Sequence, residues 1–333
     1  MGSFAGHVIP GTLFLLVGLW HLRCGIKNYL AAPQAFVSRM WHPAPLPGHW
    51  SRLELYIIVA GSFLDMTLVE LGIGTGFRPI ENGGVAPGHL NNFEHASMLL
   101  MFFVLGCAVL VSETTSLLPL PLGALHVLAA LAFLCEGLLF SLHSTTHSGA
   151  EPRYHLLLAL CIAACVACAL LAAACPRSFL LDAFGSGAIA LQGLWFWQTA
   201  MSLYGPLIPS GCYLQPNTTL RCDSEEIEHR GTALAVLQFI ALLASILVLC
   251  LVYYGVAART APQPSLDFIR ATHAVKCVEG KGCVSGNKAE VGLVGVALHE
   301  EEKGTREMDS GGEEETRLLS VGKDNSGEYN SVL

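Results

Sequence analysis

Charged residues are scarce in this chain. Asp, Glu, Lys and Arg make up 13% of its 333 residues, whereas 53% are hydrophobic and the mean hydropathy is +0.52. A soluble domain carries roughly 25% charged residues, so this composition excludes an ordinary soluble protein of the same length. It predicts an all-α fold, a polytopic bundle of transmembrane helices.

Several signatures of known chemistry are also missing. The sequence has no Walker loop, no dinucleotide-binding fingerprint and no serine-triad motif, so nucleotide-driven transport and serine hydrolysis have no support. The net charge of -8 comes from acidic residues gathered after residue 299, and nothing in it indicates a nucleic-acid partner. No Lys or Arg precedes the first apolar run at His7, and no cleavage motif accompanies it, so we expect a retained span.

Apolar runs long enough to cross a lipid bilayer recur up to residue 256. A hydrocarbon core of about 30 Å requires roughly 20 helical residues. Seven runs meet this length: 7–23, 54–74, 93–112, 118–142, 154–175, 179–204 and 232–256. Asp65 and Glu70 interrupt the second of them. Residues 1–256 are therefore predicted to form one seven-span transmembrane domain.

The basic residues predict how these spans are oriented. Short loops rich in Lys and Arg remain in the cytoplasm. Four basic residues lie between the first two spans, with no acidic residue before Glu54: Arg23, Lys27, Arg39 and Arg52. We therefore expect a multi-pass protein of an endomembrane compartment or the plasma membrane, with its N-terminus outside and its C-terminus in the cytoplasm.

The loop 205–231 is then predicted to lie outside. It contains the glycosylation motif Asn217-Thr218-Thr219, whose acceptor is Asn217. Cys212 and Cys222 flank this motif, and an oxidising compartment would allow them to form a disulfide. Both features agree with the orientation that the basic residues predict.

Polar side chains gather in the predicted outer halves of the spans. Isolated ionisable groups that face lipid are costly, so their concentration predicts a water-accessible cavity that opens outward. The residues expected to line it are His7, Glu70, Gln192 and Gln198. Three residues do not follow this pattern: Glu54, His126 and Asp182.

A cluster of carboxylates and imidazoles suggests a metal site in the same region. Glu136 and His143 are seven residues apart and His143 and His147 four, so they share one face of a helix. Imidazole and carboxylate together suit zinc. The candidate metal ligands are Glu136, His143, His147, His155, Glu94 and His95.

Three interpretations of this cluster stay open. The one we favour is an interhelical hydrogen-bond network, or a set of side chains in the headgroup region. The second is a bound metal, with zinc as the expected ion. The third is a pathway for protons or a small solute.

Residues 257–333 are predicted to form a disordered, acidic cytoplasmic tail, because they contain few aromatic residues and no apolar span. Glu314 followed by Leu318 and Leu319 has the form of an acidic dileucine sorting signal. Ser331 and Leu333 fit a PDZ-binding terminus. The partners expected from these motifs are sorting adaptors and a PDZ-domain protein.

The chain also resembles a known family. Gly6-His7, Ile9-Pro10-Gly11-Thr12, Phe14 and Gly18-Leu19-Trp20 resemble the start of the TMEM45 family, which contains the domain of unknown function 716. Later similarities are His95, Glu136 with His143, His147 and His155, and Leu191-Gln192-Gly193 with Trp195-Phe196 and Gln198.

The resemblance implies a multi-pass protein without an established activity. The chain departs from the family in its last span, where Phe239-Ile240-Ala241-Leu242 stands in the region of a Trp-His-Tyr motif. A metal ligand from that helix is therefore missing, and the chain is expected to be a divergent member.

From these features we expect a scaffold or trafficking component of the endomembrane system that interacts with the lipid bilayer and is not an enzyme. Two alternatives stay open. One is an intramembrane zinc hydrolase that acts on a lipid, and the other is a proton or metal-ion conductor.

Overall fold

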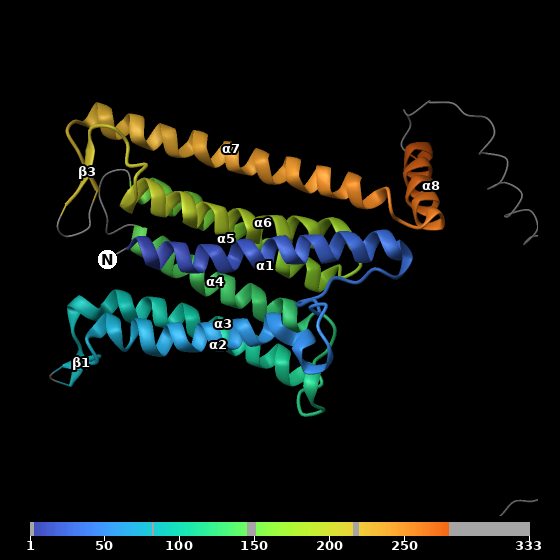
Figure 1. The fold of residues 1–333 in the computed structure, drawn as a ribbon, viewed down its shortest axis with the longest axis horizontal. Coiled ribbons are helices and arrows are strands. Elements are labelled where there is room, and N and C mark those ends of the chain that lie inside the picture. The colour runs from blue at the N-terminus through green and yellow to red at the C-terminus, as the bar shows by residue number, and fades with distance from the viewer. Residues whose placement is uncertain (1–2, 82, 145–150, 216–219, 280–333) are drawn as a thin grey trace, which may run out of the picture. The chain divides into compact units, whose positions relative to one another are not determined.

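Long helices dominate the computed structural model, which describes residues 3–81, 83–144, 151–215 and 220–279 (Figure 1). The α-helices are α1 (Phe4–Ala31), α2 (Leu53–Leu64), α3 (Leu90–Thr114), α4 (Ala124–Ser144), α5 (Glu151–Ala174), α6 (Phe179–Thr199), α7 (Glu225–Ala258) and α8 (Gln263–Glu279). Within the described ranges, seven helical segments are long and apolar enough to cross a membrane. The predicted all-α transmembrane fold is thus confirmed.

Shorter elements extend or connect these helices. The turns of 3₁₀-helix are η1 (Pro33–Ala35), η2 (Gly48–Arg52), η4 (Ile73–Thr75) and η5 (Pro87–His89), and the π-helical turns are η3 (Asp65–Glu70) and η6 (Ala200–Tyr204). Two antiparallel hairpins pair β1 (Ile80–Glu81) with β2 (Gly84–Val85) and β3 (Cys212–Leu214) with β4 (Leu220–Cys222). With η2, η3 and η4, α2 becomes a continuous helical segment over Gly48–Thr75.

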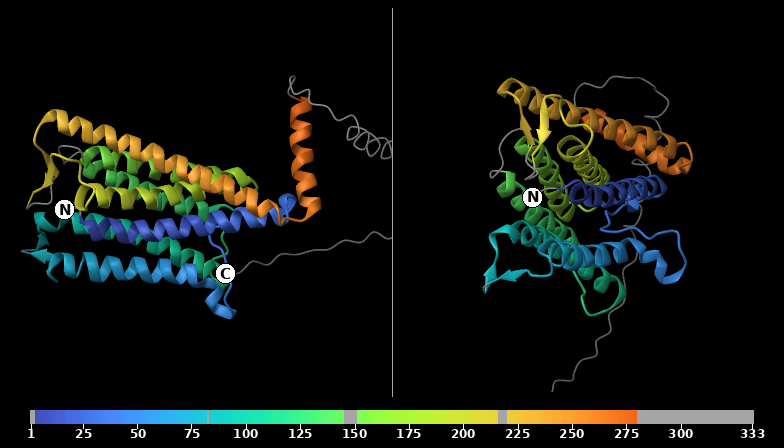
Figure 2. Two further views of the ribbon diagram at one scale, coloured as in Figure 1. Left: turned by 45° about the horizontal axis from the view of Figure 1, so that its top comes forward. Right: turned by 60° about the vertical axis from the view of Figure 1, so that its left-hand side comes forward.

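The two ends of the bundle differ. Both hairpins lie beside the start of α1, and we name this the hairpin end (Figures 1 and 2). The connection from α1 to α2, residues 32–52, lies at the opposite end, which we name the loop end (Figure 1).

Residues 1–273 form one compact unit and residues 274–333 a second, of which only the end of α8 is described. Within the first unit, α6 lies along α1, and α2 and α3 form a separate pair on the far side of α4 (Figure 1).

Serine residues begin three of the helices. Ser3, Ser178 and Ser224 are N-caps of α1, α6 and α7, and each hydroxyl accepts a hydrogen bond from a backbone N–H three residues later. These bonds satisfy donors that the first helical turn leaves free. Three glutamates in the first turn of α7 are also favourable beside its partial positive charge.

Several helix ends differ from the predicted limits, and two of these differences have a physical reason in the structure. The fourth span begins at Ala124, not at residue 118, because Pro119 and Pro121 cannot continue helical hydrogen bonding and Gly123 has a φ of 87°. Disorder directly after residue 256 is also wrong, because α7 continues to Ala258 and α8 follows.

The packing of α8 explains the second error. Leu266 and Ile269 pack against Leu22, Ile26 and Leu30 of α1. The Ser265 hydroxyl donates to the backbone oxygen of Ala31 at 3.1 Å. The segment has too few apolar residues to appear as a span, so only its tertiary contacts identify it.

Glycine allows α1 and α6 to approach each other closely. A Cβ atom at Gly18 would lie 2.8 Å from the Cα of Ala190, and one at Gly193 would lie 2.8 Å from the Cα of Leu15. Small residues permit such backbone contact between helices in lipid, where dispersion forces supply much of the association energy. The helices α1 and α6 are thereby packed closely together, and α6 also carries the buried polar residue Gln192.

Candidate functional site

Glu136 of α4 lies in the interior of the bundle. Its side chain is 3% exposed, and Gln192 of α6 donates from Nε2 to its Oε1 at 2.8 Å. Cys165 of α5 donates from Sγ to Oε1 of Gln192 at 3.5 Å. The second oxygen of Glu136, Oε2, is buried and receives no hydrogen bond from the described part of the chain. An ionisable group is thus held among three helices with one oxygen unsatisfied.

Aromatic side chains lie within one helical turn of this pair: Trp195 follows Gln192 on α6, and Phe133 and Phe140 flank Glu136 on α4. Trp195 is fully buried, stacks on Tyr154 and donates from Nε1 to the Tyr154 backbone oxygen at 2.9 Å. The Tyr154 hydroxyl donates to Oε1 of Gln238 in α7 at 3.2 Å. An isolated carboxylate in such apolar surroundings is much more costly than its neutral acid. Binding or release of a proton by Glu136 therefore changes the free energy of the folded bundle.

A second polar group, which we name the His7 group, lies toward the hairpin end. It contains His7, Glu151, His155 and Tyr204, and the centroid of the His7 ring lies 5.2 Å from that of Tyr204 and 6.1 Å from that of His155. Tyr204 donates from its hydroxyl to Oε1 of Glu151 at 3.0 Å. His7 donates from Nδ1 to the Ser3 backbone oxygen at 2.9 Å, and its Nε2 has no hydrogen-bond partner within the described ranges.

Phe140 separates the His7 group from Glu136. It lies one helical turn after Glu136 on α4, and its ring stacks on His155 with centroids 6.0 Å apart. It also packs edge-on against Phe196 of α6 at 5.7 Å. The interior acid is therefore close to the His7 group but shielded from it by apolar rings.

A third polar group links the first two spans at the loop end. Nε2 of His21 in α1 lies 2.6 Å from Oε1 of Glu54 in α2. The other Glu54 oxygen accepts a hydrogen bond from the backbone N–H of His42 at 3.0 Å. One buried carboxylate thus fixes α1, α2 and the connection between them.

Ser38 continues this arrangement toward α4 and α6. Its hydroxyl donates to Oδ1 of Asp182 at 2.6 Å and lies 3.3 Å from Nε2 of His126. Oδ2 of Asp182 is buried without a partner among the described residues. Four helices and one loop therefore meet through polar side chains at the loop end.

The predicted metal ligands are only partly brought together. Glu136 and His155 are buried in the bundle, whereas His95 lies 3.1 Å from Oε1 of Glu70 on the α2–α3 pair, next to the half-buried Glu94. The side chain of His143 and the whole of His147 lie outside the described residues.

No three His, Cys, Asp or Glu side chains within the described ranges are placed to hold a metal ion. The zinc site stays a prediction, because two of its proposed ligands, the side chains of His143 and His147, lie outside the described residues.

The residues predicted to line an outer cavity have different environments. His7 and Gln192 are buried in the interior. Gln198 donates from Nε2 to the Ser202 hydroxyl on the same helical segment at 2.9 Å. Glu70 accepts from Asn92 at 2.8 Å and pairs with His95. The outward-opening cavity stays a prediction. A cavity of about 330 Å³ lies at the loop end instead.

The β3–β4 hairpin contains the expected cysteine pair. Cys212 and Cys222 face each other across the hairpin and are joined by a disulfide. The glycosylation acceptor Asn217 lies outside the described residues. So do the predicted tail motifs, Glu314, Leu318, Leu319, Ser331 and Leu333.

Sequence reasoning missed the polar group at the loop end. One signal was present, because the three exceptions Glu54, His126 and Asp182 stand near the beginnings of α2, α4 and α6, which all lie at this end. Ser38 and His42 lie in an irregular connection without periodicity, so no sequence pattern indicates their contacts.

A family model matches the part of the chain that contains Glu136. Residues 122–255 match the model described as a family of unknown function, DUF716. The match includes α4 to α6 and all but the last three residues of α7, and thus the Glu136–Gln192 pair and the disulfide hairpin. Residues 122–255 are thus similar to the DUF716 family, in agreement with the resemblance that the sequence motifs predicted.

Proposed function

We propose that the bundle conducts protons between its two ends, with Glu136 as the internal proton-binding group. The observation that supports this role is the buried carboxyl group, held at one oxygen by Gln192 and without a described hydrogen bond at the other. Ionisable residues inside membrane proteins are costly, and they commonly serve proton or ion pathways.

The distribution of polar groups supports the same proposal. Ionisable side chains occur at three levels: the His7 group, Glu136, and the loop-end group around Glu54 and Asp182. Each end therefore offers groups that can accept and release protons.

Proton transfer between Glu136 and the polar group at the loop end must cross a long distance. His126 and Glu136 are ten residues apart on α4, a separation of about 15 Å at the helical rise. Direct hydrogen bonds cannot cover this distance. Water must therefore bridge the interval when protons pass.

Glu136→Gln tests the proposal with little change in shape. The new side chain retains an oxygen that can accept from Gln192, but it cannot bind and release a proton. Purified wild-type protein is reconstituted into liposomes, and valinomycin with a potassium gradient sets a membrane potential that draws protons inward. We expect the pH indicator pyranine, trapped inside, to report acidification of the interior. The Glu136→Gln variant is expected to reduce this flux to the level of protein-free liposomes.

Glu113→Gln is the matched control, since Glu113 is exposed at the end of α3 and the substitution is chemically identical. It is expected to retain wild-type flux. Wild-type flux no greater than in protein-free liposomes would contradict the proposal, as would an unchanged rate in a well-folded Glu136→Gln variant.

A second proposal concerns the tail and rests on sequence motifs alone. Glu314 with Leu318 and Leu319, and the terminal Ser331 and Leu333, support a scaffold or trafficking role through sorting adaptors and a PDZ-domain protein. Deleting residues 314–333 is expected to redistribute the protein among cellular membranes and to abolish recovery of these partners. Unchanged distribution together with unchanged partner recovery would remove its support.

A further inference from the structure

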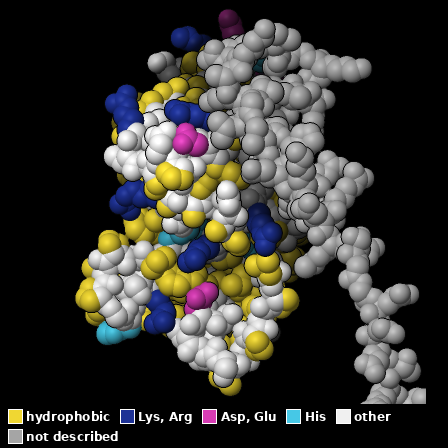
Figure 3. Space-filling view, turned by 90° about the vertical axis from the view of Figure 1, so that its right-hand side faces the viewer, with side chains coloured by type: hydrophobic (Ala, Val, Ile, Leu, Met, Phe, Trp, Pro, Cys, Tyr) yellow, Lys and Arg dark blue, Asp and Glu magenta, His cyan; other side chains and the backbone are white. Residues whose placement is uncertain are grey.

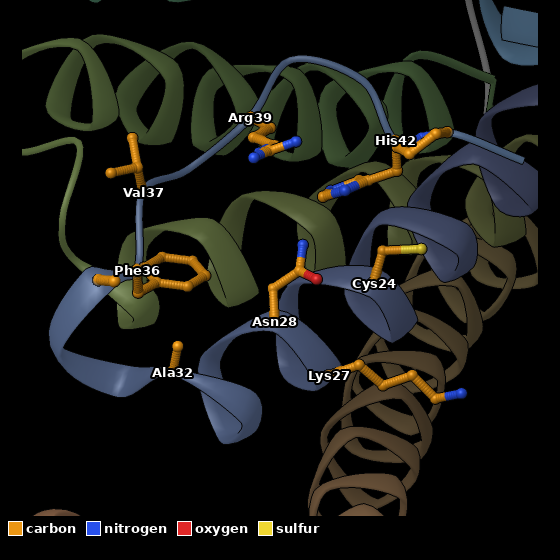
Figure 4. Close-up of a pocket in the computed structure, with 10 residues that line it drawn as sticks. Cys24, Lys27, Asn28, Ala32, Phe36, Val37, Arg39 and His42 are labelled. Carbon is orange, nitrogen blue, oxygen red and sulfur yellow. The ribbon is translucent and has the colours of Figure 1, made fainter. Parts of the chain in front are cut away.

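A cavity at the loop end has a lining suited to an anion. Its volume is about 330 Å³, and it lies between the last turns of α1 and residues 32–43 (Figure 4). This volume is within the range of small-molecule sites. Lys27, Asn28, Arg39 and His42 line it, and no acidic residue does so within the described ranges.

Three of these side chains converge on one space. The Arg39 guanidinium, the His42 ring and the Asn28 amide point toward a common region, while the Lys27 ammonium turns away from it (Figure 4). Neither Lys27 nor Arg39 forms an ion pair with any described residue. Among the described residues both charges are therefore unpaired, and the charge of Arg39 is the one directed into this space.

His42 supplies an independent indication that a ligand belongs here. The residue is 3% exposed, and its Nε2 is buried without a hydrogen-bond partner among the described residues. The His42 backbone is held at both polar atoms, because its N–H donates to Glu54 at 3.0 Å and its oxygen accepts from Trp20 at 3.4 Å. A buried ring is thus fixed in the cavity wall with one nitrogen unsatisfied.

The charge state of His42 determines which interaction its ring can make with a bound anion. Burial lowers its pKa from 6.5 to about 4, and nearby His21 adds to this effect. The ring is therefore neutral at pH 7, and in its Nε2–H tautomer it can donate one hydrogen bond to an anion. The positive charge in this space comes from Arg39.

We propose that this cavity binds the phosphate group of a membrane-lipid headgroup. A guanidinium presents two parallel N–H donors that match phosphate oxygens. His42 and Asn28 add neutral donors, and the apolar side chains of Phe36, which is buried, and Val37, which is exposed, suit the glycerol and upper acyl regions. This mixed lining favours a lipid over free phosphate.

The position of the cavity agrees with a headgroup. α1 has 28 residues, so it is about 42 Å long and exceeds a hydrocarbon core of about 30 Å. Its last turns therefore reach the headgroup region. Lys and Arg side chains gather on the loop end (Figure 3), which would attract anionic lipid.

One feature of α1 opposes anion binding, namely the partial negative charge at its C-terminus. Two of the carbonyl groups there are already satisfied. The Asn28 oxygen accepts from the Ala32 N–H at 3.1 Å, and the Ala31 oxygen accepts from Ser265 at 3.1 Å. These bonds reduce the repulsion that an anion would meet.

The test measures lipid binding to full-length, detergent-purified protein by microscale thermophoresis. The probes are dioctanoyl phosphatidic acid, dioctanoyl glycerol and inorganic phosphate. We expect phosphatidic acid to bind more tightly than both other probes. Arg39→Gln should weaken it by about tenfold, the loss expected when one charged hydrogen-bond donor is removed.

Arg177→Gln is the matched control, because Arg177 is exposed at the same end and does not line this cavity. It should leave the affinity within about twofold, a change of under 0.5 kcal/mol. Both substitutions affect exposed side chains, so both variants should fold.

Equal affinity of the wild type and Arg39→Gln for phosphatidic acid would overturn the site. Binding of dioctanoyl glycerol as tightly as phosphatidic acid would overturn phosphate recognition. Equally tight binding of inorganic phosphate would overturn the lipid as its source.

Discussion

Alanine at Gly18 or Gly193 is expected to lower the stability of the protein by about 1–3 kcal/mol, the usual cost of overpacking a close contact. The new Cβ atom at Gly18 would collide with the backbone of Ala190, and the one at Gly193 with that of Leu15. Backbone atoms cannot move aside as a flexible side chain does. The α1–α6 pair must therefore separate, and the contacts along both helices weaken.

Thermal unfolding of the detergent-purified protein, monitored by size-exclusion chromatography, measures this effect. Gly255→Ala is the matched control, since a Cβ atom at Gly255 of α7 meets nothing within 4 Å. Alanine has a higher helix propensity than glycine by about 1 kcal/mol, so this control should unfold at the same or a higher temperature. A higher unfolding temperature for all three variants would contradict the close α1–α6 contact.

The transmembrane fold could be predicted because a single physical quantity determines it. Each span must be about 20 apolar residues long and must satisfy its own backbone hydrogen bonds. Hydropathy alone therefore located all seven spans, including the second, where Asp65 and Glu70 lie in the π-helical turn η3. The failure at α8 has the same origin, because its packing on α1 rests on two apolar residues, Leu266 and Ile269.

The interior site could be predicted only in part. Glu136 and Gln192 were each identified as polar residues in apolar spans, but 56 residues separate them. Hydropathy assigns residues to spans without defining which faces meet. Their hydrogen bond depends on the packing of α4 against α6, for which no local pattern exists. His42 illustrates the extreme case, since both its partners and its burial arise from tertiary structure.

Glu54→Ala is expected to cost about 3–5 kcal/mol, the loss typical when one partner of a buried ion pair is removed. Glu54 is 9% exposed and accepts from His21 and from the backbone of His42. Alanine would leave both groups in the interior without an acceptor. The connection between α1 and α2 would then lose the hydrogen bond from its His42 N–H to Glu54.

The same thermal-unfolding measurement can separate this specific loss from a general effect of removing a carboxylate. Glu113→Ala removes an exposed acid at the end of α3 and should change stability by less than about 0.5 kcal/mol. Glu54→Gln retains one acceptor oxygen and should be intermediate. In a double-mutant cycle with His21→Ala, the two losses should be smaller together than their sum, because they remove the same contact. Strict additivity would show that Glu54 stabilises the protein independently of His21.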